Sequence, residues 1–223
     1  MSVRGFACLF LLLAFSVATP PAHAQTTGGC PAPEALEAAP QLVRAGDQAA
    51  IASFRETAPC HYWITFYFAA ESLFKSGEKD EAVRWFYVGQ LRSRTTAMLD
   101  PRSTPSLVQA LQFVVGQPIN EYAGGDRDKW LANIDWALEW DRQHPMTLNS
   151  VRRVGHQSYP GVTELDFDPS HPLHFEPLSP PITQAQLDAA YDQQRRGLTG
   201  LRESVERVSP EEWARQRRAS GLQ

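Results

Sequence analysis

Residues 61–75 form the most apolar segment outside the first 24 residues, and they constrain the fold more than any other stretch. A helix over this segment is apolar on nearly every face, so it lies either at the centre of a core or carries an aromatic binding face. Central packing is the favoured interpretation. Gly77 suits the left-handed cap that ends the helix, and Asp80 is predicted to cap the next one. The large apolar residues of the segment are Tyr62, Trp63, Ile64, Phe66, Tyr67, Phe68, Leu73 and Phe74.

Small and large residues alternate over about residues 61–92 in a way that resembles a tetratricopeptide repeat. The residues that carry the resemblance are Ala69, Ala70, Leu73, Gly77, Ala82, Phe86 and Gly89. The stretch Ala82-Val83-Arg84-Trp85 is also similar to the Ala-x-x-Trp of Sel1-like repeats. The resemblance implies two antiparallel helices in close contact, of the kind that present a groove to another protein.

Helical periodicity continues on both sides of this hairpin, whereas strand signals are scarce. Residues 33–58 predict a short helix, a break at Pro40 and a second helix capped by Asp47. Residues 104–115 predict another helix, which we expect the glycine and proline of residues 116–118 to stop.

A longer helix is predicted over residues 126–143, with Asp126 as its cap. Trp136 and Trp140 lie four residues apart on a face of their own. Their rings either pack against a second neighbouring helix or are exposed for contact with a binding partner. Packing is the favoured interpretation. The main apolar stripe is made of Trp130, Leu131, Ile134 and Leu138.

The C-terminal part again predicts helices, from 183 to 208 and from Ser209 onward. Residues 183–186 form a capping box. Gly197 and Gly200 weaken the first of these helices, and they are expected to permit a close helix crossing.

Residues 144–182 interrupt the helical pattern with seven prolines. A connection of this length is usually functional or mobile. Residues 162–167 alternate apolar and polar side chains, enough for one short strand. The predicted fold is therefore a single mainly α domain over residues 25–223, either a helical-hairpin array or an irregular bundle with one long proline-rich loop.

The first 24 residues have the organisation of a secretory signal peptide. Arg4 precedes a dozen apolar residues, and small residues follow, ending in Ala22-His23-Ala24. The apolar run is too short to span a membrane, and no later run is long enough either. We expect cleavage after Ala24 and a periplasmic mature protein.

Export gives a meaning to the two cysteines that remain, Cys30 and Cys60. Paired cysteines in an oxidising compartment favour a disulfide. Two buried thiols, or a lipidated Cys30 that leaves Cys60 alone, are the alternatives.

The charge of the chain argues against a nucleic-acid partner, which requires clustered cations. The 21 basic and 25 acidic residues give a net charge of −4. Loss of Arg4 with the leader would change this to −5.

Only one segment predicts a metal site, the acidic loop of residues 164–176. His171 and His174 have chelating spacing, and Asp166 and Asp168 could supply oxygen ligands. Its prolines and its lack of a known metal motif favour a solvated loop, so we expect no metal or cofactor. A metal-dependent hydrolase that uses this loop stays open as an alternative.

These patterns predict a non-enzymatic, exported protein-binding module. In type and compartment it resembles the periplasmic immunity proteins of toxin–immunity pairs, which implies direct binding of a toxin or effector encoded by an adjacent gene. An adaptor in cell-envelope assembly or regulation is the alternative. The expected contact surface combines the loop around Asp166 and Asp168 with ring-bearing side chains of the helices. These are Trp63, Tyr67, Trp85, Tyr87, Trp136 and Trp140.

Overall fold

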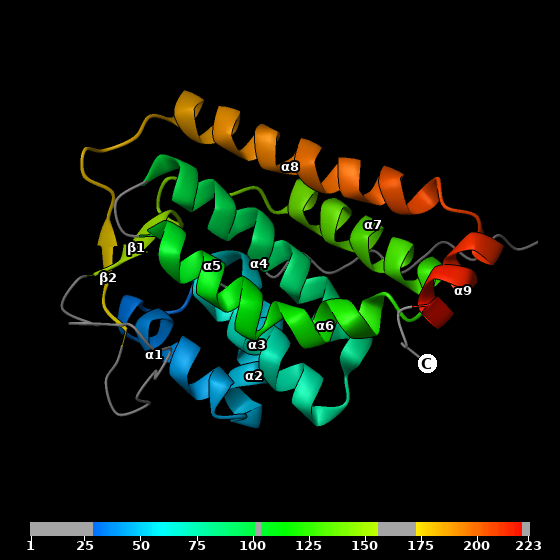
Figure 1. Cartoon of the computed structure of the whole chain (residues 1–223). Coiled ribbons are helices and arrows are strands. Elements are labelled where there is room, and N and C mark those ends of the chain that lie inside the picture. Colours follow the sequence, from blue (N-terminus) through cyan, green and yellow to red (C-terminus); the bar gives the residue numbers. More distant parts are fainter. Residues whose placement is uncertain (1–28, 101–103, 156–172, 220–223) are drawn as a thin grey trace, which may run out of the picture.

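The chain folds into a mainly helical body, as the periodicity predicted (Figure 1). The computed structural model describes residues 29–100, 104–155 and 173–219. Of the helices in these ranges, none has the length and apolar character needed to cross a membrane. The elements are α1 (Pro33–Arg44), α2 (Gln48–Thr57), a 3₁₀ turn η1 (Ala58–Cys60), α3 (Trp63–Ser76), α4 (Lys79–Leu99), α5 (Thr104–Val114), α6 (Gly116–Ala123), α7 (Arg127–Gln143), β1 (Arg152–Val154), β2 (Phe175–Pro177), α8 (Gln184–Glu206) and α9 (Pro210–Ala219).

Helix α4 is the centre of the body, because α3, α5, α6, α7 and α8 all pack against it. In Figure 1, α8 lies along α4 and α7 at the top, and α1 and α2 lie at the bottom. Helix α3 is buried along almost its whole length, which confirms the central position expected for residues 61–75. Burial of these apolar side chains is the main stabilising contribution to the fold.

Helices α3 and α4 form the predicted hairpin. Gly77 ends α3 in the left-handed conformation, at φ 94°. At Gly89 an added methyl group would lie 3.1 Å from Phe66 Cβ, so the small residue lets the two backbones approach closely.

The caps predicted from local sequence are confirmed at three helices. Asp47 accepts a hydrogen bond from the Ala50 amide at 2.9 Å, and Asp126 accepts one from the Lys129 amide at 3.1 Å. Thr183 begins α8 with the complete capping box. Each of these caps satisfies amides that the first helical turn leaves unpaired.

Two predicted boundaries were wrong. Helix α1 runs through Pro40, which is buried, and ends at Arg44. Helix α4 begins at Lys79, so Asp80 lies in its first turn instead of capping it. Helix α5 ends at Val114, as expected before Gly116, but the sequence did not predict that Gly116 begins a further helix, α6. Packing against neighbouring helices offsets the local cost of these residues.

The described ends of the proline-rich segment pair with each other, which the sequence did not predict. Strands β1 and β2 are antiparallel, with Arg153 opposite Glu176. The two side chains form an ion pair, Nη2 to Oε2, at 2.6 Å. The strand expected at residues 162–167 lies outside the described residues.

A methyl group on Gly116 would collide with the core. An ideal Cβ there lies 2.5 Å from Phe86 Cζ, and Phe86 has no exposed surface into which its ring can move. We expect Gly116→Ala to lower the free energy of unfolding by about 1–3 kcal/mol, measured as a shift in the urea midpoint.

Gly197 is the matched control, because a methyl group there meets no atom within 4 Å. The close helix crossing expected at Gly197 and Gly200 is therefore wrong. Gly197→Ala should raise stability by up to about 1 kcal/mol, since alanine favours the helix. A Gly116→Ala variant as stable as the wild type would contradict the predicted collision.

Candidate functional site

Four of the rings expected at a contact surface lie in the core. Trp63, Tyr67, Trp85 and Tyr87 are each at most 4% exposed. The expectation that they form a contact surface is wrong, because α3 and α4 are covered by neighbouring helices on the faces that carry these rings.

Trp136 and Trp140 are half-buried and pack on Trp85, as the packing interpretation predicted. The ring centroid of Trp85 lies 5.1 Å from that of Trp136 and 5.1 Å from that of Trp140, and both contacts are edge-to-face. Edge-to-face pairs of this kind stabilise a core beyond their buried area. The two tryptophans of α7 therefore join α7 to α4.

The loop proposed as a metal site is described only at its C-terminal end. Asp166, Asp168 and His171 lie outside the described residues. His174 Nδ1 lies 3.9 Å from Glu37 Oε1, and Glu176 pairs with Arg153. Within the ranges that the structure covers, no group of three or more His, Cys, Asp or Glu side chains is placed to hold a metal ion.

The predicted disulfide joins Cys30 to Cys60, with their Cα atoms 5.6 Å apart. It connects the start of the described chain to η1. The carbonyl of Pro59 in η1 accepts a hydrogen bond from Arg92 at 3.4 Å. The turn η1, which carries the disulfide, is therefore also joined to the central helix α4 by a hydrogen bond from the buried Arg92 guanidinium.

Arg92 is a buried cation held by carbonyls and rings. It is 1% exposed, and its Nη2 donates to the His144 carbonyl at 2.8 Å. Its guanidinium lies over the rings of Phe66 and Trp140, 4.8 and 5.1 Å from their centroids. Cation–π contacts of this kind help to offset the desolvation of the charge.

His61 lies close to this cation and is kept neutral. Its Nε2 is 3.0 Å from Thr57 Oγ1, whose hydroxyl donates to the Ser53 carbonyl. Because the Thr57 hydroxyl hydrogen is used in the bond to Ser53, His61 Nε2 must be the donor in its contact with Thr57 Oγ1 and carries the imidazole proton. His61 Nδ1 is buried without a hydrogen-bond partner among the described residues. Burial, and next the charge of Arg92, lower the pKa of His61 to about 4.

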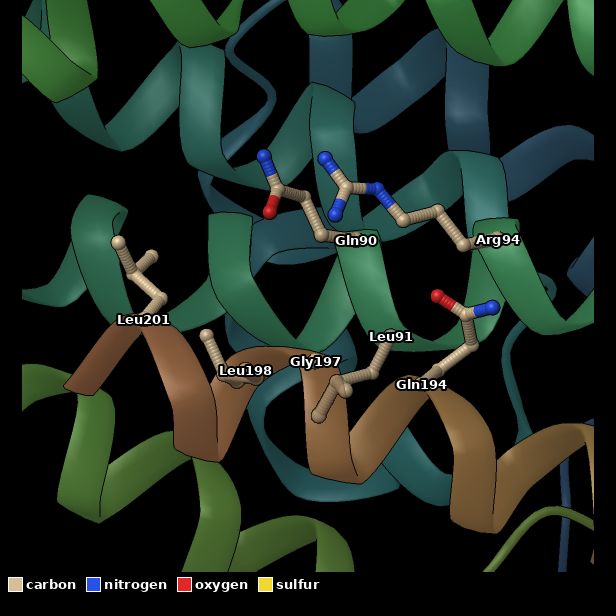
Figure 2. Close-up of a pocket in the computed structure, with 7 residues that line it drawn as sticks. All are labelled: Gln90, Leu91, Arg94, Gln194, Gly197, Leu198 and Leu201. Atoms are coloured by element: carbon tan, nitrogen blue, oxygen red, sulfur yellow. The ribbon is translucent and has the colours of Figure 1, made fainter. Parts of the chain in front are cut away.

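A small cavity lies between α4 and α8. Figure 2 shows Gln90 and Arg94 of α4 beside it, and Gln194 of α8 pointing toward Arg94. Its volume of about 50 Å³ has room for a water molecule or two, but not for a substrate.

A larger cavity, which we call the polar cleft, has a volume of about 270 Å³. It is the better candidate for a binding site, because it combines space with convergent polar and aromatic groups. Its walls come from the first turn of α4, the end of α6, the first half of α7, and α9. The lining residues are Asp80, Glu121, Tyr122, Ala123, Gly125, Asp126, Lys129, Trp130, Asn133 and Arg217.

Asp80 is oriented by its neighbours in the polar cleft. The Tyr122 hydroxyl donates to Asp80 Oδ1 at 3.0 Å, and Asn133 Nδ2 donates to the same oxygen at 3.5 Å. Burial, and then the Asp80 carboxylate, raise the pKa of Tyr122, so its hydroxyl stays protonated and remains a donor. Asp80 therefore presents a fixed negative charge beside the Tyr122 and Trp130 rings, an arrangement suited to a cationic group.

Helix α9 contacts the body at one edge of the polar cleft, where α6 ends in two glycines. Trp213 Nε1 donates to the Gly124 carbonyl at 3.1 Å, and its ring lies 5.5 Å from that of Trp130. Arg217 donates to the Gly125 carbonyl. Neither Trp213 nor Arg217 was singled out from the sequence as a site residue. The signal available was their four-residue spacing, which puts both on one helix face.

No family model and no solved structure matches the chain. The chain is 37% identical, over 84 residues, to an uncharacterized protein of Haemophilus influenzae. The match covers 37% of this chain and 33% of that protein. The chain therefore aligns with about a third of the length of this relative.

Proposed function

We propose that the chain is an exported, non-catalytic module that binds another protein, and that its partner is an antibacterial toxin encoded beside it. On this proposal it is a periplasmic immunity protein. The signal-peptide pattern of residues 1–24 and the Cys30–Cys60 disulfide support export. The disulfide and the buried core hold the surface of the protein in a fixed arrangement. Binding of a partner to such a preformed surface loses little conformational entropy.

The observation that carries the binding function is the polar cleft. Asp80, Glu121 and Asp126 give it carboxylates, and Tyr122 and Trp130 give it aromatic walls. A partner that offers a basic side chain matches both features, because a carboxylate pairs with the charge and the ring faces attract it.

A charge-matched pair of variants tests this role. Asp80→Asn keeps an oxygen that accepts from Tyr122 but removes the negative charge. Asp192→Asn removes one charge from an exposed position on α8. With the product of the adjacent gene as the probe in isothermal titration, we expect Asp80→Asn to weaken binding at least tenfold. Asp192→Asn should stay within about twofold, since tenfold corresponds to about 1.4 kcal/mol. Equal effects of the two variants would contradict a role for the cleft.

A competition assay in cells tests the biological role. A strain that lacks the chain should be killed by neighbours that deliver the adjacent gene product. The full-length chain should restore survival, whereas a chain without residues 1–24 should not. Survival of the deletion strain against every such neighbour would count against immunity.

A further inference from the structure

The way α9 attaches to the body indicates what the edge of the polar cleft is built to bind. Among its described residues α9 has no fully buried side chain, and its apolar contact with the body includes the half-buried Trp213 ring against Trp130. Its contacts with the body include those of Trp213 and Arg217, which reach the carbonyls of Gly124 and Gly125. We call this pair of carbonyls, together with the Trp130 ring, the α9 dock.

The polar cleft is still open beside Arg217, so α9 fills only part of the available space. Without α9 the cleft would lose its arginine. Its charged lining would then be Asp80, Glu121 and Asp126 against Lys129. Among the residues that line the cleft, acidic side chains would then outnumber basic ones, which suits a cationic helix better than an acidic one.

The end of α8 is held by contacts that do not involve α9. Arg127 of α7 binds carbonyls at and just beyond the end of α8: its Nη2 donates to the Glu206 carbonyl at 2.8 Å, and its Nε to the Val208 carbonyl at 2.7 Å. These bonds fix the end of α8 directly before α9 begins at Pro210. Release of α9 then breaks the contacts of Trp213 and Arg217 and leaves those of Arg127 intact.

We infer that the α9 dock is a receptor for a cationic helix of a partner protein, one that carries a large aromatic residue and an arginine four positions later. Helix α9 occupies this receptor within the same chain. The partner's apparent affinity is then its intrinsic affinity multiplied by the fraction of molecules in which α9 is released. The inference deepens the proposed binding function and rests on it, but it is testable on the purified chain alone.

The test supplies α9 as a separate molecule. The probe is a fluorescein-labelled peptide of residues 209–219, titrated by anisotropy into the full-length chain that carries Trp213→Ala and Arg217→Ala. We expect this variant to bind the peptide at least tenfold more tightly than the wild-type chain, in which α9 competes. A peptide with the same two substitutions should not bind.

A second variant guards against damage from the first. Ala214→Pro breaks α9 but leaves every residue of the dock unchanged, and it should also bind the wild-type peptide. In both variants, hydrogen exchange should quicken in α9 and stay unchanged in α7 and α8. Addition of Asp80→Asn should weaken peptide binding. The inference is overturned if neither variant binds the peptide, or if both bind it no better than the wild type. Either result leaves the toxin titration with the intact chain to decide the proposed function separately.

Discussion

Loss of the Cys30–Cys60 disulfide should lower the free energy of unfolding by about 3–4 kcal/mol. The bond closes a loop with a sequence separation of 30 residues, and the chain-entropy model assigns about this cost to a loop of such length. The measurement is urea denaturation of the Cys30→Ser/Cys60→Ser variant against the oxidised wild type at neutral pH.

Reduction of the wild type is the matched control for this prediction. A phosphine reductant should bring the wild type to the midpoint of the double variant and leave the variant itself unchanged. Because η1 is also joined to α4 through Arg92, we expect the reduced protein to stay folded without denaturant. Identical midpoints for oxidised wild type and variant would show that the bond does not stabilise the folded chain.

Acidification should destabilise the protein through His61. The folded state holds the pKa of His61 at about 4, whereas the ordinary value is 6.5. Between these two values the unfolded chain takes up a proton that the folded chain does not, so stability falls as the pH falls from about 6.5 to about 4. The loss should reach about 3 kcal/mol, since each pKa unit corresponds to about 1.4 kcal/mol.

His61→Gln separates this effect from the titration of carboxylates. Glutamine keeps a donor for Thr57 Oγ1 but cannot take up a proton in this range. Urea midpoints at pH 7 and pH 4.5 should therefore differ less for the variant than for the wild type. An equal loss of stability in both proteins would mean that His61 is already protonated in the fold, or that it does not affect stability.

Local sequence predicted those features of the fold that depend on neighbours along the chain. Asp47 and Asp126 each bond an amide three residues away, so the short pattern contains the whole interaction. Pro40 misled for the opposite reason. The packing of α1 on α3, which keeps Pro40 inside a helix, involves segments that are distant in the sequence.

The candidate site could not be assembled from the sequence for the same reason. The polar cleft draws Asp80, Tyr122, Trp130 and Arg217 from four helices, so no short motif includes all of its walls. Periodicity also marks a ring as apolar without saying which helix covers it. Trp63 and Tyr67 were therefore expected at a contact surface even though central packing of their helix was favoured, and the structure places both in the core.

Three tryptophans of α4 and α7, the trio Trp85, Trp136 and Trp140, should provide a spectroscopic signal of native packing. Trp136 and Trp140 are stacked at 17° to each other, and both meet Trp85 edge-on, so their fixed asymmetry should give a strong near-ultraviolet circular dichroism. That signal vanishes when a core becomes molten while its helices persist. Departure of α9 involves a different pair of indoles, Trp130 and Trp213, and should leave the signal of the trio in place.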